Sequence, residues 1–480
     1  MKHRYLNFFF SLLLGVFCVN AFGQTELKSK IADFSTFAPI ESASIYIENT
    51  TIGTISNTDG KFLLQVPREF ENDTLVISSI GYKSFRTAIP DFDPTMDIFL
   101  EEDIASLDEI ILVASTRPKT GNDIVLRAIE ELPENLPEQP YLQKGFLRHK
   151  ERNKKEFKWL IESALTLYDS SYASGAEDNL KINVDEVRKS YDLRDVDSLF
   201  AYTAYLKSRT RNKALRVKNL RRDTIKTKSL VEAIKWNDSR VNGLENLFRG
   251  RLNLVRNSNI AGALFGKNML DKHQFELDTV LVDNERKLYK IKISKSESFV
   301  GLNTKGIYNE GYEANGWLYI YWDTYAIKKI EYQLTAASAA QKSRSKTLFD
   351  TLVNHKMVMT YMEYQDKMYP NYFYYETPKL VKIGDRSSDK TKSDKTKKED
   401  EIQREKDEQF YYTVQEILFS EIVQDPELIN EALQKDWSED IFSPRPYNKT
   451  FWKNYNVLLE SEEEEKLIQD LSTRASLFKQ

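Results

Sequence analysis

Between residues 26 and 101 the chain consists of short runs in which apolar and polar side chains alternate, and turn residues separate these runs. The alternation is clearest at residues 44–48 and 62–66. Asp59 and Gly60 precede the second run, and an Asp-Gly pair accepts the positive φ angles of a tight hairpin turn. About seven such runs, with turns about every eight to twelve residues, predict a β-sandwich.

The first 23 residues have the three regions of a secretory signal. Residues 2–4 are basic, residues 8–19 are apolar, and small residues stand at Ala21 and Gly23. We expect cleavage after Gly23, which makes Gln24 the first mature residue. The apolar run is shorter than the roughly 18 to 20 residues that span a bilayer, and no later run reaches that length. The sequence therefore predicts an exported protein without a transmembrane span.

Cysteine usage and charge exclude several kinds of site. The single cysteine, Cys18, lies inside the expected signal, directly after Val16 and Phe17. A lipid-anchored cysteine of a bacterial lipoprotein follows a small residue. We therefore expect Cys18 to be an ordinary residue of the signal peptide rather than a lipid anchor. The mature chain then has no thiol for a disulfide or a thiolate metal site. Loss of Lys2 and Arg4 moves the formal net charge from −4 to −6, and this acidity argues against nucleic acid as a partner.

Four segments of the expected sandwich carry a resemblance: Ala38-Pro39-Ile40-Glu41-Ser42-Ala43, Gly53-Thr54 with Asp59-Gly60-Lys61-Phe62, Val66-Pro67, and Asp73 through Ser79-Ile80-Gly81-Tyr82. Together they resemble the carboxypeptidase-regulatory-like domain of exported Bacteroidetes proteins, which also begins many TonB-dependent outer-membrane transporters. The resemblance implies an accessory β-sandwich and a Gram-negative envelope location. The opening strand, expected at residues 29–34, lacks the glycine and valine usual in that family.

A boundary follows the sandwich. Residues 106–114 include an apolar stretch that we expect to be a last strand or a linker. Asn122 is expected to cap a short helix in residues 124–132, where apolar residues recur at helical spacing until Pro133. Further prolines at 137 and 140 mark the boundary.

The rest of the chain predicts a mixture of strands and helices. Helices are expected at residues 230–236, 243–254, 425–433 and 461–471, and the last has Ser461 and Glu464 at capping-box spacing. Strands are expected at residues 146–149, 158–168, 274–283, 287–294, 358–365 and 371–376, with a hairpin at 317–334. The strands between residues 274 and 376 favour a curved antiparallel sheet. Their pattern resembles the half-barrel of exported lipoprotein carriers, without a diagnostic motif.

These observations predict a mainly β, α+β chain: an Ig- or prealbumin-like sandwich followed by a larger domain with a curved, half-barrel-like sheet. The expected segments are a signal at 1–23, the sandwich at 24–104, a linker with a short helix at 105–140, and the α+β domain at 141–480. Residues 386–408 are almost entirely charged or polar, which predicts a flexible loop within the last domain. An electrostatic docking arm is the alternative for this loop, although both signs of charge are mixed.

One set of residues has the spacing of a zinc carboxypeptidase site, namely His273, Glu276 and His355. On an alternating strand, residues three apart point to opposite faces, so His273 and Glu276 are not expected to share a metal. His149 completes the small set of histidines in the mature chain, and each is expected to be a strand or surface residue. Common catalytic motifs, including Gly-x-Ser-x-Gly, His-Glu-x-x-His and the phosphate loop, are absent from the sequence.

Two other groups invite a binding interpretation. Asn57, Asp59 and Gly60 resemble part of a calcium loop, but Lys61 brings a cation where a ligand oxygen is needed, so a turn explains them. The aromatic cluster of residues 361–375 is either a stacking platform for a sugar or peptide, or ordinary sheet packing. Its alternation places residues 372 and 374 on one face and 373 and 375 on the other, so one pair is expected in the core.

The sequence therefore favours a non-catalytic protein of the periplasm or outer membrane that binds an envelope protein, a lipid or a glycan, without catalytic, metal or cofactor residues. The first alternative is a periplasmic carrier that holds an acyl chain in the curved sheet. It requires an apolar cavity of roughly several hundred Å³. The second alternative is a hydrolase of envelope polymers, which requires convergent carboxylates with shifted pKa values in a cleft.

Overall fold

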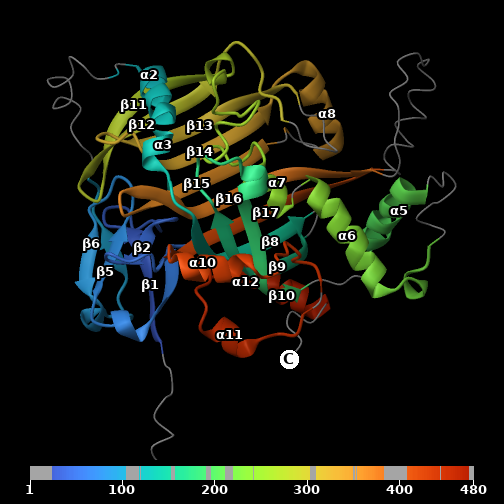
Figure 1. Ribbon diagram of the computed structural model, residues 1–480, viewed down its shortest axis with the longest axis horizontal. Helices are drawn as coiled ribbons and strands as arrows, with labels where there is room; N and C mark the ends of the chain where they lie inside the picture. Colours follow the sequence, from blue (N-terminus) through green and yellow to red (C-terminus); the bar gives the residue numbers. More distant parts are fainter. Residues whose placement is uncertain are drawn as a thin grey trace, which may run out of the picture.

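The computed structural model describes residues 24–103, 118, 120–152, 157–190, 196–210, 220–241, 243–302, 310–349, 352, 354–382, 408–443 and 445–474. Figure 1 shows the N-terminal strands, in blue, beside a large curved sheet to which most of the remaining chain contributes. The predicted signal at 1–23, the apolar stretch at 106–114 and residues 386–407 of the predicted charged loop lie outside the described residues.

The N-terminal domain is the expected sandwich of seven strands. A sheet with the order β4-β1-β7 faces a sheet with the order β3-β2-β5-β6. Ile31 and Phe62 from the first sheet and Ile45 and Ile77 from the second are fully buried in one core. The strands are β1 (Thr25–Asp33), β2 (Ser44–Ile47), β3 (Gly53–Ile55), β4 (Lys61–Val66), β5 (Thr74–Ser78), β6 (Phe85–Ala88) and β7 (Ile98–Leu100).

Two local predictions within the sandwich were wrong in detail. β1 begins at Thr25, because its first half pairs with β4 before its second half pairs with β7. Gly60 has the expected positive φ of 74°, but its turn joins strands of different sheets and is no hairpin. A Cβ atom at Gly60 would lie 2.3 Å from the carbonyl oxygen of Ile31, so this close approach also requires glycine.

The second domain is built on one antiparallel sheet of ten strands, in the order β10-β9-β8-β17-β16-β15-β14-β13-β12-β11. Only its part between residues 274 and 376 was predicted as a curved sheet. The chain enters the sheet at β8, the third strand from one edge, and returns beside it at β17, so strands far apart in sequence complete the sheet. The strands are β8 (Tyr141–Arg152), β9 (Phe157–Asp169), β10 (Leu180–Ser190), β11 (His273–Asp283), β12 (Arg286–Lys295), β13 (Tyr312–Tyr321), β14 (Ile327–Ala336), β15 (Asn354–Tyr364), β16 (Lys367–Lys382) and β17 (Glu408–Val423).

The two faces of this sheet differ in chemistry, because successive side chains of a strand point to opposite sides. One face, here the helix face, contributes Leu147, Ile417, Phe373 and other apolar residues to the main core. Helix α7 packs on it, and the ring of Phe248 contacts the rings of Phe373 and Phe419. The opposite face, here the polar face, carries Arg148, Glu416, Tyr374, Glu331 and Trp317.

The helices surround the sheet and occupy its connections (Figure 1). They are α2 (Gly121–Glu130), α3 (Leu132–Asn135), α4 (Ala176–Asn179), α5 (Val196–Thr210), α6 (Thr227–Val241), α7 (Leu244–Arg249), α8 (Ala339–Phe349), α10 (Pro426–Leu433), α11 (Lys449–Lys453) and α12 (Glu462–Arg474), with short 3-10 turns at 68–70, 89–91, 222–224 and 269–271. Thr120 caps α2 by accepting from the Asp123 N–H. The predicted cap, Asn122, instead accepts from the Phe275 N–H and ties α2 to β11.

The sandwich contacts the second domain through Ile55, which packs in an apolar cluster with Phe146 and Leu418, and through polar groups. The carbonyl oxygen of Thr51 accepts a hydrogen bond from the Glu421 N–H, and its hydroxyl oxygen accepts one from the Ile422 N–H. Both donors lie at a bulge of β17, where Glu421 has a φ of +41°. On the other side, Asn57 Nδ2 donates to the carbonyl of Glu460 at 3.0 Å, and Asp59 accepts the N–H of Glu462 at 2.7 Å. The turn at residues 57–60 is therefore also part of the contact between the domains.

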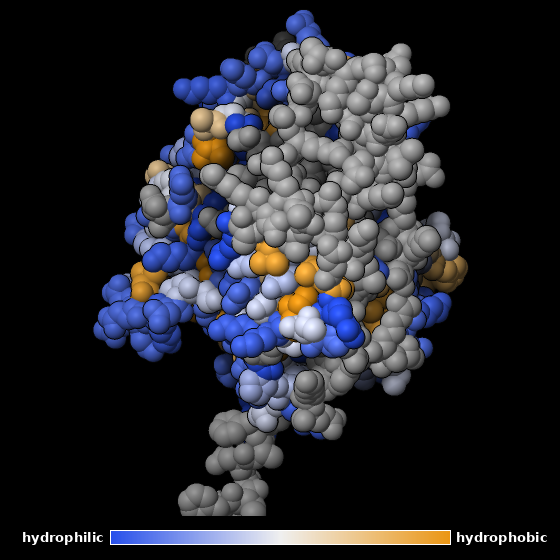
Figure 2. Space-filling view, turned by 90° about the vertical axis from the view of Figure 1, so that its right-hand side faces the viewer, coloured by the Kyte–Doolittle hydropathy of each residue, from blue (hydrophilic) through white to orange (hydrophobic). Residues whose placement is uncertain are grey.

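The described surface gives no sign of a helical membrane span. No helix in the described part of the chain is both long and apolar enough to cross a bilayer. Figure 2 views the molecule from the side of α5 and α6, and hydrophilic residues predominate among the coloured atoms, with hydrophobic residues in small separate groups.

Candidate functional site

A cleft of about 1080 Å³ lies between the sandwich, the polar face of the sheet and the C-terminal segment at residues 458–467. The sandwich contributes Glu41 and the loop at 55–58. The sheet contributes side chains from β8 and from β12 to β17. The volume is at the upper end of the range for small-molecule sites, which is roughly 300–1,000 Å³.

Strand β8 supplies three cations, because Arg148, Lys150 and Arg152 stand two residues apart and point to the polar face. The side chain of Arg148 is only 1% exposed. Its Nε donates to Glu162 at 2.9 Å, and its Nη2 donates to the carbonyl oxygen of Leu458 at 2.8 Å. The guanidinium thus fixes the C-terminal segment against the sheet.

Glu464, on the C-terminal side of the cleft, both caps a helix and pairs with the cations of β8. It forms the predicted capping box of α12, in which Ser461 N–H donates to Glu464 Oε2 and Glu464 N–H donates to Ser461 Oγ. The same carboxylate accepts from Arg148 at 3.0 Å and from Lys150 at 2.5 Å. Burial alone would raise the pKa of Glu464, but these two cations lower it to about 2.

The cations of β8 also meet carboxylates on neighbouring strands. Lys150 lies 3.0 Å from Glu416 on β17, and Arg152 lies 2.9 Å from Glu376 on β16. Tyr372 donates its hydroxyl proton to Glu416 at 3.2 Å. Each of the three β8 cations therefore has a carboxylate partner, and the cleft wall is polar without a large excess of one charge.

Glu41 differs from the other carboxylates of the cleft. It is exposed at the cleft and has no ion-pair partner within 4.0 Å among the described residues. Removal of water by the surrounding walls raises the pKa of Glu41, and the charge of Glu416 raises it further, while Lys329 lowers it. A carboxyl of this kind is the feature that the hydrolase hypothesis requires.

The aromatic cluster at 361–375 divides between the two faces as its alternation predicted. Phe373 and Tyr375 are buried in the main core on the helix face. Tyr372 and Tyr374 lie on the polar face and line the cleft, where Tyr374 is partly exposed. Trp317 on β13 also lines the cleft, with the Lys290 ammonium 4.2 Å from its ring centre.

A small apolar cavity lies on the helix face. The apolar cavity found there holds about 30 Å³ and lies between α7, β9 and β16. Phe248, Leu167 and Phe373 are among its walls. This is room for about one water molecule, not for an acyl chain.

The zinc-type set of histidines does not converge. His273 is buried, with Nδ1 2.9 Å from the carbonyl oxygen of Met269 and Nε2 2.8 Å from the hydroxyl of Tyr332. Glu276 is exposed on the opposite face of β11. His355 is buried on β15, with its ring against Tyr312. Burial lowers the pKa of His273 to about 4 and that of His355 to about 3.

The calcium-like group is a turn, as expected from Lys61. The side-chain oxygen of Asn57 accepts the N–H groups of Asp59 and Lys61, and the carboxylate of Asp59 accepts the N–H of Glu462. These hydrogen bonds engage the side-chain oxygen of Asn57 and one carboxylate oxygen of Asp59 in holding the turn.

Sequence reasoning missed the cleft itself. Of its residues, the sequence drew attention to Asn57 as part of a calcium-like group, to Tyr372 and Tyr374 as members of the aromatic cluster, and to Ser461 and Glu464 as a capping box, but it did not connect them. The alternating cations at 148, 150 and 152 were the available signal for the β8 wall. Their carboxylate partners lie hundreds of positions away, at residues 376, 416 and 464, so no spacing connects them.

The fold and the cleft define a two-domain β-rich protein with a polar interdomain cleft. Residues 28–112 match the family of the CarboxypepD_reg-like domain, so the resemblance found in the sequence is confirmed for the N-terminal domain. A curated relative is the TonB-dependent receptor SusC of Bacteroides thetaiotaomicron, which is 30% identical over 135 residues. The match covers 27% of this chain and 13% of that receptor.

Two solved structures have a distant likeness to this chain. A LolA superfamily protein from Nitrosomonas europaea is 9% identical, with a TM-score of 0.20, and the match covers 68% of this chain and 99% of that one. A putative outer membrane lipoprotein-sorting protein domain from Vibrio parahaemolyticus is 9% identical, with a TM-score of 0.20 and coverage of 65% and 97%. At these TM-scores, no property of either protein is transferred to this chain.

Proposed function

We propose that the protein is a non-catalytic binding protein of the bacterial cell envelope, and that a glycan is the ligand of the interdomain cleft. The observation that carries this proposal is the cleft's size and lining, which combine about 1080 Å³ of space with charged, amide and aromatic side chains. Sites for small polar ligands are concave and use a few convergent polar groups to fix orientation.

The charges of the cleft favour a neutral polar ligand over a strongly charged one. Arg148, Lys150 and Arg152 each lie within ion-pair distance of a carboxylate. A ligand with a large net charge would have to displace one member of a pair, whereas sugar hydroxyl groups can donate to the carboxylates and accept from the cations. Trp317 and Tyr374 add aromatic surface for the apolar faces of sugar rings.

The envelope location rests on the signal-like N-terminus and on the sandwich. The N-terminal domain matches a family represented in a TonB-dependent receptor. We therefore place the mature chain, from Gln24 onward, in the periplasm or at the outer membrane, with the sandwich as an accessory domain that also forms one wall of the cleft.

The test is calorimetric titration of residues 24–480 with soluble oligosaccharides and peptidoglycan fragments. We expect saturable binding to at least one glycan class, and Trp317→Ala to weaken it about tenfold, which corresponds to ~1.4 kcal/mol. Trp437→Ala is the matched control, because its indole donates to the Ala432 carbonyl outside the cleft. Absence of binding across the panel, or equal losses in both variants, would contradict the proposal.

An acyl-chain carrier requires a different state of the helix face. The apolar space found there is about 30 Å³, so α7 and the residues around Phe248 would have to move before a chain could enter. Native mass spectrometry of the mature protein purified from its own envelope separates the two functions. A bound lipid of defined mass would support the carrier, and a lipid-free chain that binds a glycan supports the cleft.

A hydrolase is a further candidate because of Glu41. Burial raises the pKa of this carboxyl, which suits a general acid, and the nearby charges of Glu416 and Glu331 raise it further. Release of reducing ends from a bound glycan, lost in Glu41→Gln, would replace the binding proposal by this one. Binding without turnover would leave the non-catalytic function in place.

A further inference from the structure

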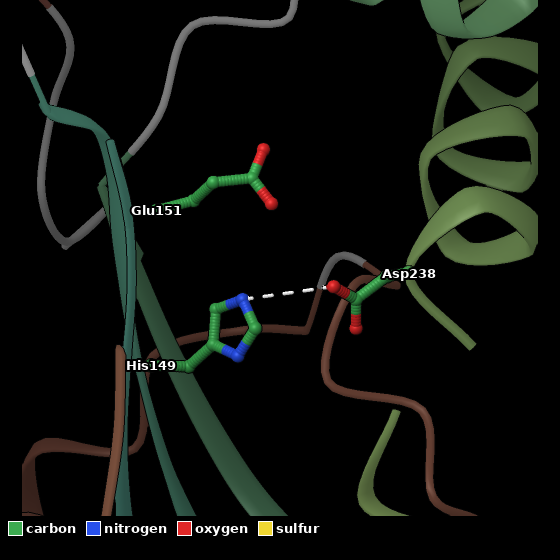
Figure 3. A group of neighbouring side chains, drawn as sticks. All are labelled: His149, Glu151 and Asp238. Carbon is green, nitrogen blue, oxygen red and sulfur yellow. Dashed lines mark ion pairs between the residues drawn. The ribbon is translucent and has the colours of Figure 1, made fainter. Parts of the chain in front are cut away.

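A second group of ionisable side chains lies on the face of β8 opposite the cleft. His149 and Glu151 alternate with the cleft cations on this strand, and Asp238 comes from the last turn of α6. The three residues are 0%, 2% and 3% exposed. In Figure 3 the three side chains point toward one another, Asp238 from the helix and the other two from the strand.

We propose that His149, Glu151 and Asp238 bind one divalent transition-metal ion that fastens α6 to the sheet. One potential ligand atom from each residue lies within 4.8 Å of the other two. His149 Nε2 and Asp238 Oδ1 are 3.9 Å apart, which is too long for a hydrogen bond. Two ligands at about 2.1 Å from a tetrahedral ion lie about 3.4 Å apart, so a small movement closes the site.

The donor set selects the class of metal. One imidazole nitrogen with two carboxylates suits Zn²⁺ or Mn²⁺, since imidazole disfavours Ca²⁺ and Mg²⁺ and no thiolate is present. A second oxygen of either carboxylate can supply a fourth ligand. All three side chains are buried among the described residues, which suits a structural ion rather than a catalytic one.

The electrostatics of α6 favour a cation at this point. Asp238 stands in the last turn of the helix, where the backbone carbonyl groups already present partial negative charge. Glu151 brings a second carboxylate to the same buried place. A divalent ion would offset the negative charge of both carboxylates and of the helix carbonyl groups. Each of the three side chains also interacts with other neighbours, so a metal competes with those contacts and micromolar rather than picomolar affinity is expected.

The surroundings of His149 fit a metal ligand. The Gln415 amide lies 3.3 Å from Nδ1, and its oxygen can accept the Nδ1 proton after rotation of the amide, which leaves Nε2 for the ion. The rings of Trp159 and Phe442 lie 6.4 and 6.0 Å from the imidazole. This aromatic shell keeps water from the site and holds the ring in place.

The experiment is titration of the full mature chain, first stripped with a chelator, with Zn²⁺ and with Mn²⁺. We expect one ion per chain to bind with micromolar affinity, and at least tenfold weaker binding in His149→Gln and Asp238→Asn. His355→Gln is the control, because it removes another buried histidine on a strand of the same sheet. Its affinity should equal that of the unaltered chain.

A measurement without substitutions guards against variants that fail to fold. Pulsed electron paramagnetic resonance of bound Mn²⁺ should detect coupling to the nitrogen of one imidazole. Absence of saturable binding, absence of nitrogen coupling, or equal affinity in the two site variants and the control each overturns the proposal. Failure of glycan binding would not affect it, because the cleft lies on the other face of β8.

Discussion

Arg148→Met removes the central cation of the C-terminal contact and should be strongly destabilising. The substitution keeps the length of the side chain but takes away hydrogen bonds to Glu162, Glu464 and the carbonyl of Leu458. The side chains of Arg148 and Glu162 are 1% and 2% exposed, and that of Glu464 is 11% exposed, so these contacts are largely shielded from water. Removal of one partner from a buried ion pair costs about 3–5 kcal/mol.

The remaining cations keep this cost near the lower end of that range. Glu162 retains Arg188 at 2.5 Å, and Glu464 retains Lys150 at 2.5 Å. We therefore expect a loss of about 3 kcal/mol in the free energy of unfolding. Because the lost contacts hold residues 458–464, the effect should be concentrated in α12.

Hydrogen exchange by mass spectrometry is the assay, combined with urea denaturation. A local loss of about 3 kcal/mol accelerates exchange in α12 by about a hundredfold, while the sandwich should change little. The control is Lys435→Met, which breaks an exposed pair with Glu431 and should cost less than about 0.5 kcal/mol. A loss below about 1 kcal/mol in Arg148→Met, or equal acceleration across the chain, would refute the assigned role.

Three further predictions concern pH and backbone geometry. The pKa of Glu464 lies at about 2, below its ordinary 4.5, so the ionised carboxylate stabilises the fold above pH 4.5. This contribution of about 3 kcal/mol is lost as the pH falls toward 2. In urea denaturation, the free energy of unfolding of Glu464→Gln should lack this decrease between pH 4.5 and 2. The pKa of buried His273 lies at about 4, below its ordinary 6.5, so the neutral imidazole stabilises the fold above pH 6.5 and this stabilisation is lost as the pH falls toward 4. The free energy of unfolding of His273→Gln should therefore change less between pH 6.5 and 4, and an unchanged pH dependence contradicts the assignment. Gly316→Ala should destabilise the protein by about 1–3 kcal/mol or more in thermal unfolding. The reason is that Gly316 has a φ of +141° and a Cβ atom there would lie 1.9 Å from the carbonyl oxygen of Glu331. Gly175→Ala is the control and should be neutral, because a Cβ atom at Gly175 meets nothing within 4 Å.

Elements with strong local signals were predicted in kind and place. The sandwich strands β2, β4, β5 and β6, the hairpin of β13 and β14, and the capping box of α12 each depend on residues close in sequence. The alternation at 372–375 likewise assigned Phe373 and Tyr375 to one face and Tyr372 and Tyr374 to the other.

Elements that depend on distant partners were missed or misplaced. β10 and α5 were not predicted, because their local patterns are weak, and β10 is defined by pairing with β9. The strand β17 was not predicted, and its neighbours in the sheet are β8 and β16. The cap of α2 was assigned to Asn122 instead of Thr120, because the contact of Asn122 with Phe275 is tertiary.

The sequence by itself determined the alternation of the predicted strands, the turns of the sandwich and the absence of cysteine after Cys18, because these follow from residue type and neighbouring positions. Only the tertiary structure decided which strands share a sheet and which charges meet. Arg148 and Glu464 are 316 positions apart and form one ion pair. His149 and Asp238 approach each other only because α6 packs on β8. Side-chain chemistry specifies what each residue can bind, but chain topology specifies which residues meet, and that information is distributed over the whole sequence.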